Sequence, residues 1–147
     1  MGLRPDSLPD IVWCAVPGGE IELEDEGGTF TVQPFHIAKY PITFIQFQAF
    51  LDDQNGFDND TWWEGLTEKY RKQAMETQHS KFVNHPRDSV SWYQTVAFCR
   101  WLSAKLLAEA WPEQAEVQPG QTGMMGRLLG REQGTKGWEI RLPTEWE

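Results

Sequence analysis

The chain has 147 residues, which is enough for one domain with its own hydrophobic core. Eight tryptophans and eight phenylalanines predict a core that is rich in aromatic rings. A net charge of -9 at pH 7 argues against nucleic acid and membranes as partners, because both carry negative charge. The first ten residues have no apolar run of a secretory signal, and no segment approaches the roughly 20 apolar residues of a membrane span. We expect a cytoplasmic protein whose residues 1–10 form a tail.

The only two cysteines, Cys14 and Cys99, both lie among apolar neighbours. Two such thiols in a chain without a signal sequence indicate a reducing compartment. We expect both to be buried structural thiols and not reactive groups.

The first third of the sequence has the pattern of short strands. An apolar run over 11–16 predicts a strand that ends at a Pro-Gly-Gly turn. Apolar and acidic residues alternate over 20–24, as in a half-buried strand, and a Gly-Gly turn then leads into 29–32 as a β-hairpin. A further short strand is expected over 34–40.

The pattern changes to that of a helix at Thr43. Thr43 and Gln46 have the spacing of a capping box, and Ile42 and Phe47 have the spacing of a hydrophobic staple. Phenylalanines then recur at helical spacing, which predicts a helix that ends at Asp52-Asp53.

Residues 55–84 form a long polar connection, in which we expect one short helix over 67–77. Connections of this length are often functional. The adjacent Trp62 and Trp63 either pack on the core or lie exposed for a ligand. We favour packing, and binding through these two rings stays open as the alternative.

Ser91 and Gln94 repeat the capping-box spacing at the start of a second predicted helix. The residues that follow at steps of three or four predict its core-facing stripe: Trp92, Val96, Cys99, Leu102, Leu106 and Ala110, with Tyr93, Ala97 and Trp101 alongside. Residues 119–137 are rich in glycine and are expected to form a loop. A last strand is expected over 138–142, and Thr144 and Glu147 then repeat the start signals of a helix.

No catalytic or metal-binding motif stands out. His36, His79 and His85 are not at metal-ligand spacing, and we expect hydrogen-bonded structural histidines. A phosphate-binding glycine loop follows a strand and ends in lysine and serine. The segment GMMGRLLG has neither feature. The residues alone predict a two-helix, several-strand α+β domain with an aromatic core and no assigned active site.

Four segments, in this order, resemble the formylglycine-generating-enzyme or sulfatase-modifying-factor family: VWCAVPGGEIEL, FHIAKYPITFIQFQAFL, NHPRDSVSWYQTVAFCRWLSAKL and IRLPTEWE. The resemblance implies a C-type-lectin-like α+β fold with two main helices and short antiparallel strands. Because RLPTE lies near the middle of the family's domain, residues 11–147 are expected to be its N-terminal portion and the fold to be incomplete. The scaffold residues that the resemblance implies are Tyr40, Pro41, Thr43, Phe47, Phe50, Ser91, Trp92, Cys99, Trp101, Arg141, Leu142, Pro143 and Glu145.

In this family the second half of the domain supplies calcium-binding loops, a substrate groove and a copper-binding cysteine pair. That pair oxidises a target cysteine to formylglycine. Neither Cys14 nor Cys99 matches it, so the resemblance implies no catalytic residue, and no copper or calcium ligand, in this chain.

Three functions stay open on the sequence. The chain is part of an oxidoreductase, or a fragment without activity of its own, or a lectin-like module that binds a protein or a small ligand. The last class includes retroelement-diversified variable proteins and modules of larger signalling proteins, and Trp62 and Trp63 would be its recognition residues. Uncovered apolar faces are expected to associate, or to be covered by a completing chain.

Overall fold

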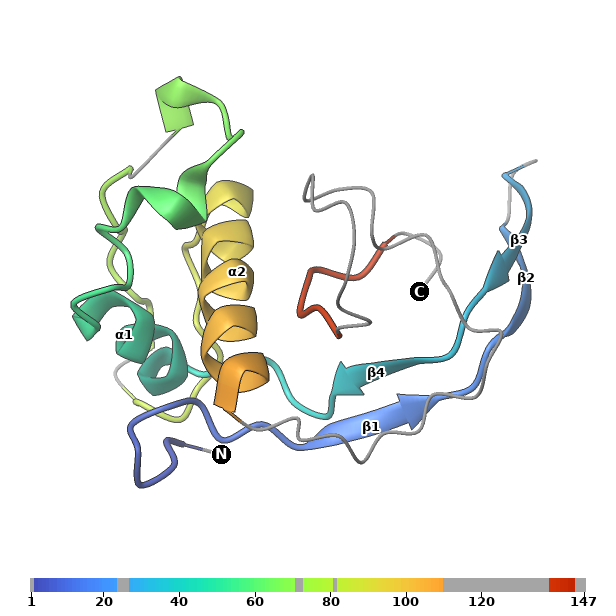
Figure 1. Ribbon diagram of the computed structural model, residues 1–147, viewed down its shortest axis with the longest axis horizontal. Helices are drawn as coiled ribbons and strands as arrows, with labels where there is room; N and C mark the ends of the chain where they lie inside the picture. Colours follow the sequence, from blue (N-terminus) through green and yellow to red (C-terminus); the bar gives the residue numbers. More distant parts are fainter. Residues whose placement is uncertain (1, 24–26, 71–72, 81, 110–137, 145–147) are drawn as a thin grey trace.

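The computed structural model describes residues 2–23, 27–70, 73–80, 82–109 and 138–144. Its elements in chain order are β1 (Trp13–Val16), β2 (Gly19–Leu23), β3 (Gly28–Val32), β4 (Phe35–Ala38), α1 (Phe44–Asp52), the 3₁₀ turns η1 (Asp60–Trp63) and η2 (Glu68–Tyr70), and α2 (Trp92–Glu109). Figure 1 shows α1 beside α2, and a narrow ribbon of strands that extends away from the two helices. The fold is therefore α+β, with two helices and short antiparallel strand pairs, as the sequence predicts.

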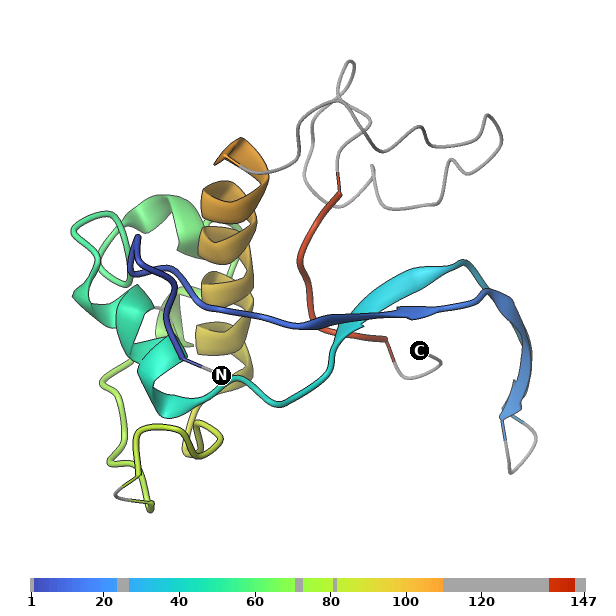
Figure 2. The same ribbon diagram turned by 90° about the horizontal axis from the view of Figure 1, so that it is seen from below.

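The ribbon consists of two consecutive two-stranded antiparallel sheets, β1 with β4 and β2 with β3 (Figure 2). The sheets meet at Gly18, where a Cβ atom would approach both Pro34 Cδ and the Val32 carbonyl oxygen to 2.8 Å. Only glycine fits this close approach of two segments of the chain without a shift of the backbone. The strands and the hairpin predicted over residues 11–40 are confirmed, with bounds that differ by a few residues at some ends.

The core lies between α1, α2 and η1, and it is built mainly from aromatic rings. Phe50, Trp63 and Trp101 are each less than 2 % exposed. The Phe47 and Phe98 rings stack with centroids 5.1 Å apart, so that α1 and α2 are joined by ring contacts. Such pairs each add about 0.5–1.5 kcal/mol beyond the area that they bury. The predicted aromatic core is confirmed.

The start of α1 is fixed by the predicted capping box. The Thr43 hydroxyl accepts from the Gln46 backbone N–H at 3.4 Å, and the Thr43 N–H donates to Gln46 Oε1 at 3.0 Å. The Gln46 amide also donates to the Asp10 carbonyl oxygen at 2.7 Å. One buried glutamine thus ties the helix start to the N-terminal segment.

We expect Thr43→Ala to lower the free energy of unfolding by about 1 kcal/mol, because it leaves a helix N–H without its side-chain acceptor. Urea denaturation followed by circular dichroism measures the change. Thr61→Ala, at an exposed position in η1, is the matched control and should change stability by less than about 0.5 kcal/mol. Equal decreases in the free energy of unfolding for the two variants would show that the Thr43 hydroxyl does not act as a helix cap.

The end of α1 is held by the carboxylate of Asp53. Its Oδ2 atom accepts from Trp101 Nε1 at 2.8 Å and pairs with Lys105 Nζ at 2.7 Å, while Oδ1 accepts from the Asn55 N–H. Burial alone would raise the pKa of Asp53. The hydrogen bonds from Lys105, Asn55 and Trp101 outweigh this effect, so the pKa of Asp53 lies below its ordinary value.

A carboxylate whose pKa is lower in the folded state than in the unfolded chain stabilises the fold at pH values above its unfolded-state pKa. This stabilisation is lost as the pH falls through its folded-state pKa. We therefore expect Asp53→Asn to cost about 1–3 kcal/mol at pH 7, and less as pH falls below about 4. Urea denaturation between pH 3 and pH 7 measures the difference. Asp52→Asn, which removes the same charge at an exposed position, should cost under about 0.5 kcal/mol at pH 7. A cost for Asp53→Asn that grows toward acid pH would contradict the prediction.

Residues 2–10, which the sequence suggests are a tail, pack in part against the core. Leu8 is 8 % exposed and joins the aromatic core, and Pro9 is also buried. A turn from Arg4 to Leu8 folds the chain back, with Leu3 bridging to Pro9. The Pro, Asp and Ser residues that make this segment look like a tail are those that form the turn.

Two further expectations about secondary structure are wrong. The helix expected over 67–77 is only the 3₁₀ turn η2, and residues 73–79 have no regular structure. Residues 138–142 form no strand. Instead, the Ser103 hydroxyl on α2 accepts from the Ile140 N–H at 2.7 Å and donates to the Ile140 carbonyl oxygen at 3.1 Å. In both segments the backbone bonds to side chains in place of a helical or strand partner.

Three expectations concern residues outside those that the structure describes. They are the loop over 119–137, the stripe position Ala110, and the helix start at 144–147 except for Thr144. Within the described residues, no helix combines the length and the apolar character needed to cross a bilayer.

Candidate functional site

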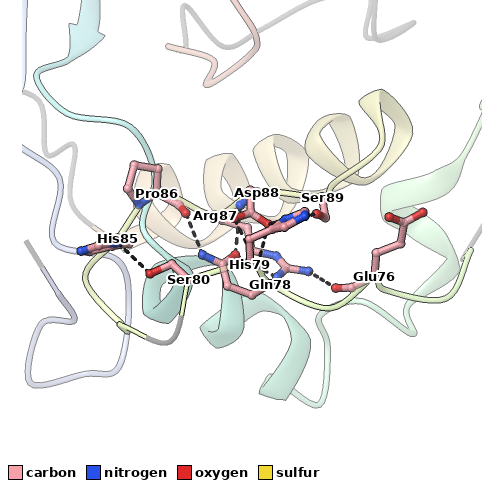
Figure 3. Close-up of polar contacts among 9 residues, drawn as sticks. All are labelled: Glu76, Gln78, His79, Ser80, His85, Pro86, Arg87, Asp88 and Ser89. Carbon is pink, nitrogen blue, oxygen red and sulfur yellow. Dashed lines mark hydrogen bonds and ion pairs between the residues drawn. The ribbon is translucent and has the colours of Figure 1, made fainter.

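An extensive polar network joins side chains and backbone of residues 76–80 and 82–89, hereafter the 76–89 loop (Figure 3). The loop sits against the first turn of α1. The Phe44 N–H donates to the His85 carbonyl oxygen at 2.8 Å, and the Ile45 N–H donates to the Val83 carbonyl oxygen at 3.0 Å. Helix-initial N–H groups have no partner within their own helix, so the loop supplies the missing acceptors.

The two sides of the loop are joined by Gln78 and Arg87. Gln78 Oε1 accepts from Arg87 Nη1 and from the Asp88 N–H, both at 3.0 Å, and its Nε2 donates to the Pro86 carbonyl oxygen at 2.9 Å. Arg87 Nη2 donates to the Glu76 carbonyl oxygen at 2.8 Å. These bonds cross between sequence positions 76–78 and 86–88, so they hold the loop in one shape.

The guanidinium of Arg87 also lies over the Phe44 and Phe47 rings, 5.7 and 5.9 Å from their centroids. Burial lowers the pKa of Arg87 and the nearby Asp88 charge opposes this, but an arginine stays charged at neutral pH. The cation–π contacts attach the loop to the aromatic side of α1.

Two serine–histidine contacts in the loop raise the question of nucleophilic chemistry. Asp88 Oδ1 and Ser89 Oγ both lie 3.1 Å from the same atom, His79 Nδ1. A catalytic triad needs the carboxylate and the hydroxyl on opposite ring nitrogens. Hydrogen bonds from the His79 ring and backbone hold the pKa of Asp88 below its usual range. This arrangement orients a turn and does not activate the serine.

The second contact joins Ser80 Oγ to His85 Nδ1 at 2.7 Å. The expectation of hydrogen-bonded structural histidines is therefore confirmed for His79 and His85. His36 lies exposed on β4, with its ring 5.1 Å from that of Trp138. No group of three or more histidine, cysteine or acidic side chains suited to a metal ion occurs among the described residues.

The tip of the loop is apolar and faces solvent. Phe82 is 65 % exposed and Val83 is 55 % exposed, and the Phe82 ring lies 4.9 Å from that of His85. The sequence did not indicate this pair, because it does not show whether two apolar residues within a polar connection are buried or exposed. Exposed apolar side chains on a fixed loop suit the binding of a partner.

The two rings of the tryptophan pair lie in different surroundings. Trp63 is fully buried, and its Nε1 donates to the Phe57 carbonyl oxygen at 2.8 Å. The favoured interpretation, packing on the core, is thus confirmed for Trp63. Trp62 is half-buried and donates to the Asn55 carbonyl oxygen at 2.6 Å.

The scaffold residues implied by the resemblance divide into two groups. Thr43 and Ser91 are capping residues, and Phe47, Phe50 and Trp101 are core residues. The others lie at or near the surface: Tyr40, Pro41, Trp92, Cys99, Arg141, Leu142 and Pro143 are exposed or half-buried, and Glu145 is outside the described residues. The core position expected for Trp92 is wrong, since this ring is 60 % exposed.

The two cysteines lie on different elements. Cys14 on β1 and Cys99 on α2 are both free, half-buried thiols. Cys99 packs against the aromatic core. Burial, with a smaller effect from the Glu139 carboxylate, raises the pKa of Cys99 to about 11, which agrees with the structural role expected of this thiol.

A shallow hollow lies where the ribbon joins the helices, and its cavity volume is about 10 Å³. This is the lower limit for one water molecule, and the hollow is too small for a substrate. Its lining residues are Asp10, Ile11, Val12, Tyr40, Pro41, Ile42 and Gln46.

The fold and this loop define a small α+β domain that presents a rigid, hydrogen-bonded loop at the start of its first helix. The family model of the sulfatase-modifying factor enzyme 1-like domain matches residues 3–147, and the chain belongs to this family. Comparisons with curated proteins and with solved structures gave no match.

Proposed function

We propose that this chain is a noncatalytic, lectin-like recognition domain of the sulfatase-modifying-factor family that binds a protein or a small ligand. The observation that supports it most is the 76–89 loop. Its base is fixed by hydrogen bonds to α1 and across the loop, while Phe82 and Val83 at its tip are exposed. A fixed loop loses little conformational entropy on binding, so it suits recognition.

The cysteine positions support the noncatalytic part of the proposal. Formylglycine generation in this family uses a pair of cysteines that binds copper. The only cysteines of this chain are Cys14 and Cys99, and they lie on different elements as free thiols. The chain's own residues therefore provide neither the thiolate pair for copper nor, among the described residues, a cluster of carboxylates for calcium.

The charge of the chain bears on its partner and its location. A net charge of -9 favours a protein or a small ligand over nucleic acid or an anionic membrane. The two free thiols fit a cytoplasmic location, since disulfides form mainly in oxidising compartments. In such a role the domain would act as a binding module of a larger assembly, including a signalling protein.

The noncatalytic part is tested with copper, oxygen and a cysteine-containing sulfatase peptide. The aldehyde product is captured by an aminooxy reagent and measured by mass spectrometry. We expect no more aldehyde from the wild-type chain than from a Cys14→Ser/Cys99→Ser variant. Aldehyde that only the wild-type chain forms would contradict the proposal.

The recognition part is tested by selecting peptides from a phage-displayed library on the immobilised wild-type chain. We expect the enriched peptides to bind Phe82→Ser/Val83→Ser at least about tenfold more weakly, which corresponds to about 1.4 kcal/mol. Leu3→Ser, which removes another exposed apolar side chain, is the control and should bind normally. Peptides that bind all three proteins equally would overturn the assignment to this loop.

A further inference from the structure

We propose that the outer edge of β1 and β2 binds a basic, extended segment of another polypeptide, which adds to the ribbon as a third strand. The edge runs from Trp13 to Leu23 and lies away from the helix pair (Figures 1 and 2). The 76–89 loop is not part of it, so the proposal does not depend on the proposed function.

The first argument is the sheet topology. β1 pairs only with β4 and β2 only with β3 among the described residues, so β1 and β2 each have one edge that faces no other described strand. A strand edge presents backbone N–H and C=O groups that can pair with an added strand. An isolated two-stranded sheet is marginal in water, so a third strand would stabilise the ribbon.

The second argument is charge. Residues 11–38 contain five acidic residues and neither lysine nor arginine; the acids are Glu20, Glu22, Glu24, Asp25 and Glu26. Glu20 and Glu22 are exposed on one face of β2, where their cross-strand partners are Thr31 and Thr29. No ion pair of the described residues includes either glutamate. Their charges are therefore available to a basic partner.

The third argument is the alternation of side chains along β2. Ile21 and Leu23 lie on the face opposite to Glu20 and Glu22. Residues directly opposite each other in neighbouring strands interact across the sheet. A segment in which lysine or arginine alternates with apolar residues would place its positive charges beside Glu20 and Glu22, and its apolar side chains beside Ile21 and Leu23. Trp13 adds a partly exposed apolar side chain at the other end of the edge.

The same charges disfavour a second copy of this chain as the added strand. The chain has a net charge of -9, and pairing two copies along this edge would place glutamates near glutamates. The occupant that the edge fits is a basic peptide segment, which binds by backbone hydrogen bonds and is selected by its charge.

The experiment uses a fluorescent peptide of about ten residues that alternates lysine and valine, long enough to span the edge. A glutamate–valine peptide of equal length is the comparison. Fluorescence anisotropy with the full chain should show binding of the basic peptide that weakens as salt is added, and at least about tenfold weaker binding of the acidic one. Equal binding of the two peptides would overturn the proposal, since apolar contact alone would then explain it.

The variant Glu20→Lys/Glu22→Lys should bind the basic peptide at least about tenfold more weakly and should gain affinity for the acidic one. Glu64→Lys/Glu68→Lys changes the same charge at two exposed positions outside the ribbon and the 76–89 loop, and it should leave the preference unchanged. If both double variants lost the same affinity for the basic peptide, binding would depend on the overall charge of the chain, and the proposed site would be wrong. The Phe82→Ser/Val83→Ser variant should bind both peptides as the wild type does. Sedimentation that shows dimers of the wild-type chain formed along this edge would also contradict the proposal.

Discussion

Trp63→Ala should lower the free energy of unfolding by about 3–5 kcal/mol, a large share of the 5–15 kcal/mol typical of a domain. Trp63 is fully buried, and its ring lies 5.1 Å from that of Phe57 in an edge-to-face contact. The substitution removes these contacts, leaves a cavity beside α2, and deprives the Phe57 carbonyl oxygen of its donor. Each of these losses destabilises the folded state.

Urea denaturation monitored by circular dichroism measures this change, provided that the dependence on urea concentration is the same in both proteins. Trp92→Ala is the matched control, because it removes the same ring from a position that is 60 % exposed. It should cost less than about 1 kcal/mol. A cost below 1 kcal/mol for Trp63→Ala as well would show that the ring is not part of the core and would reopen its role in binding.

The features that sequence alone could predict are those specified by neighbouring residues. The capping boxes depend on pairs three positions apart, Thr43 with Gln46 and Ser91 with Gln94, and both form as expected. The hairpin of β2 and β3 depends on strict alternation and a glycine turn, and it also forms. In each case the deciding interaction is local, so its sequence pattern suffices.

The buried face of α2 was only partly predicted by its periodicity. Among the side chains that the structure describes, Ala97, Trp101 and Leu102 are buried as expected, but Trp92 is exposed, and Gln94 and Phe98 are buried outside the expected stripe. Apolar residues occur on several sides of this helix, so more than one face satisfies the helical period. The choice is made by distant contacts, such as the bond from Gln94 Nε2 to the Gln73 carbonyl oxygen and the stacking of Phe98 on Phe47.

The candidate site was only partly visible in the sequence, for the same reason. Asp88 and Ser89 are residues typical of turns, and long connections such as residues 55–84 are often functional. The bonds that shape the site, however, link Gln78 with Pro86 and His79 with Asp88, and neither pair has a spacing that marks a motif. Trp62 and Trp63 were candidates for binding because their rings are large and apolar. The same large apolar area favours the burial of Trp63 in the core.

The 76–89 loop connects the starts of both helices, and this has a consequence for the proposed function. It accepts hydrogen bonds from α1 at Val83 and His85 and leads directly into the cap of α2 at Ser91. The exposed Phe82 and Val83 are therefore carried by a segment that is bonded to both helix starts, whereas the ribbon that we assign to a basic partner lies apart from the helices (Figure 1). The two surfaces that we propose for recognition are thus separate.

Gly56→Ala should also destabilise the domain strongly, by about 3 kcal/mol, at the upper end of the cost of overpacking. Gly56 lies in the turn that follows α1, where its N–H donates to the Asp53 carbonyl oxygen at 2.8 Å. A Cβ atom at this position would lie 1.9 Å from the Phe50 carbonyl oxygen and 2.9 Å from that of Asp53. Both are backbone atoms, so a side chain cannot rotate away to relieve the contact.

The turn must therefore shift, and the hydrogen bond from the Phe57 N–H to the Phe50 carbonyl oxygen, 3.1 Å long, is the first contact to be lost. The movement would displace the Phe57 ring from Trp63 and loosen the carboxylate of Asp53, so the effect should reach the core. We expect the melting temperature to fall by roughly 10 °C. Gly19→Ala is the matched control, since no atom lies within 4 Å of a Cβ there, and it should leave the melting temperature within about 2 °C of the wild type. Equal melting temperatures for Gly56→Ala and Gly19→Ala would show that the turn accommodates a methyl group and that its close approach to α1 is not needed for stability.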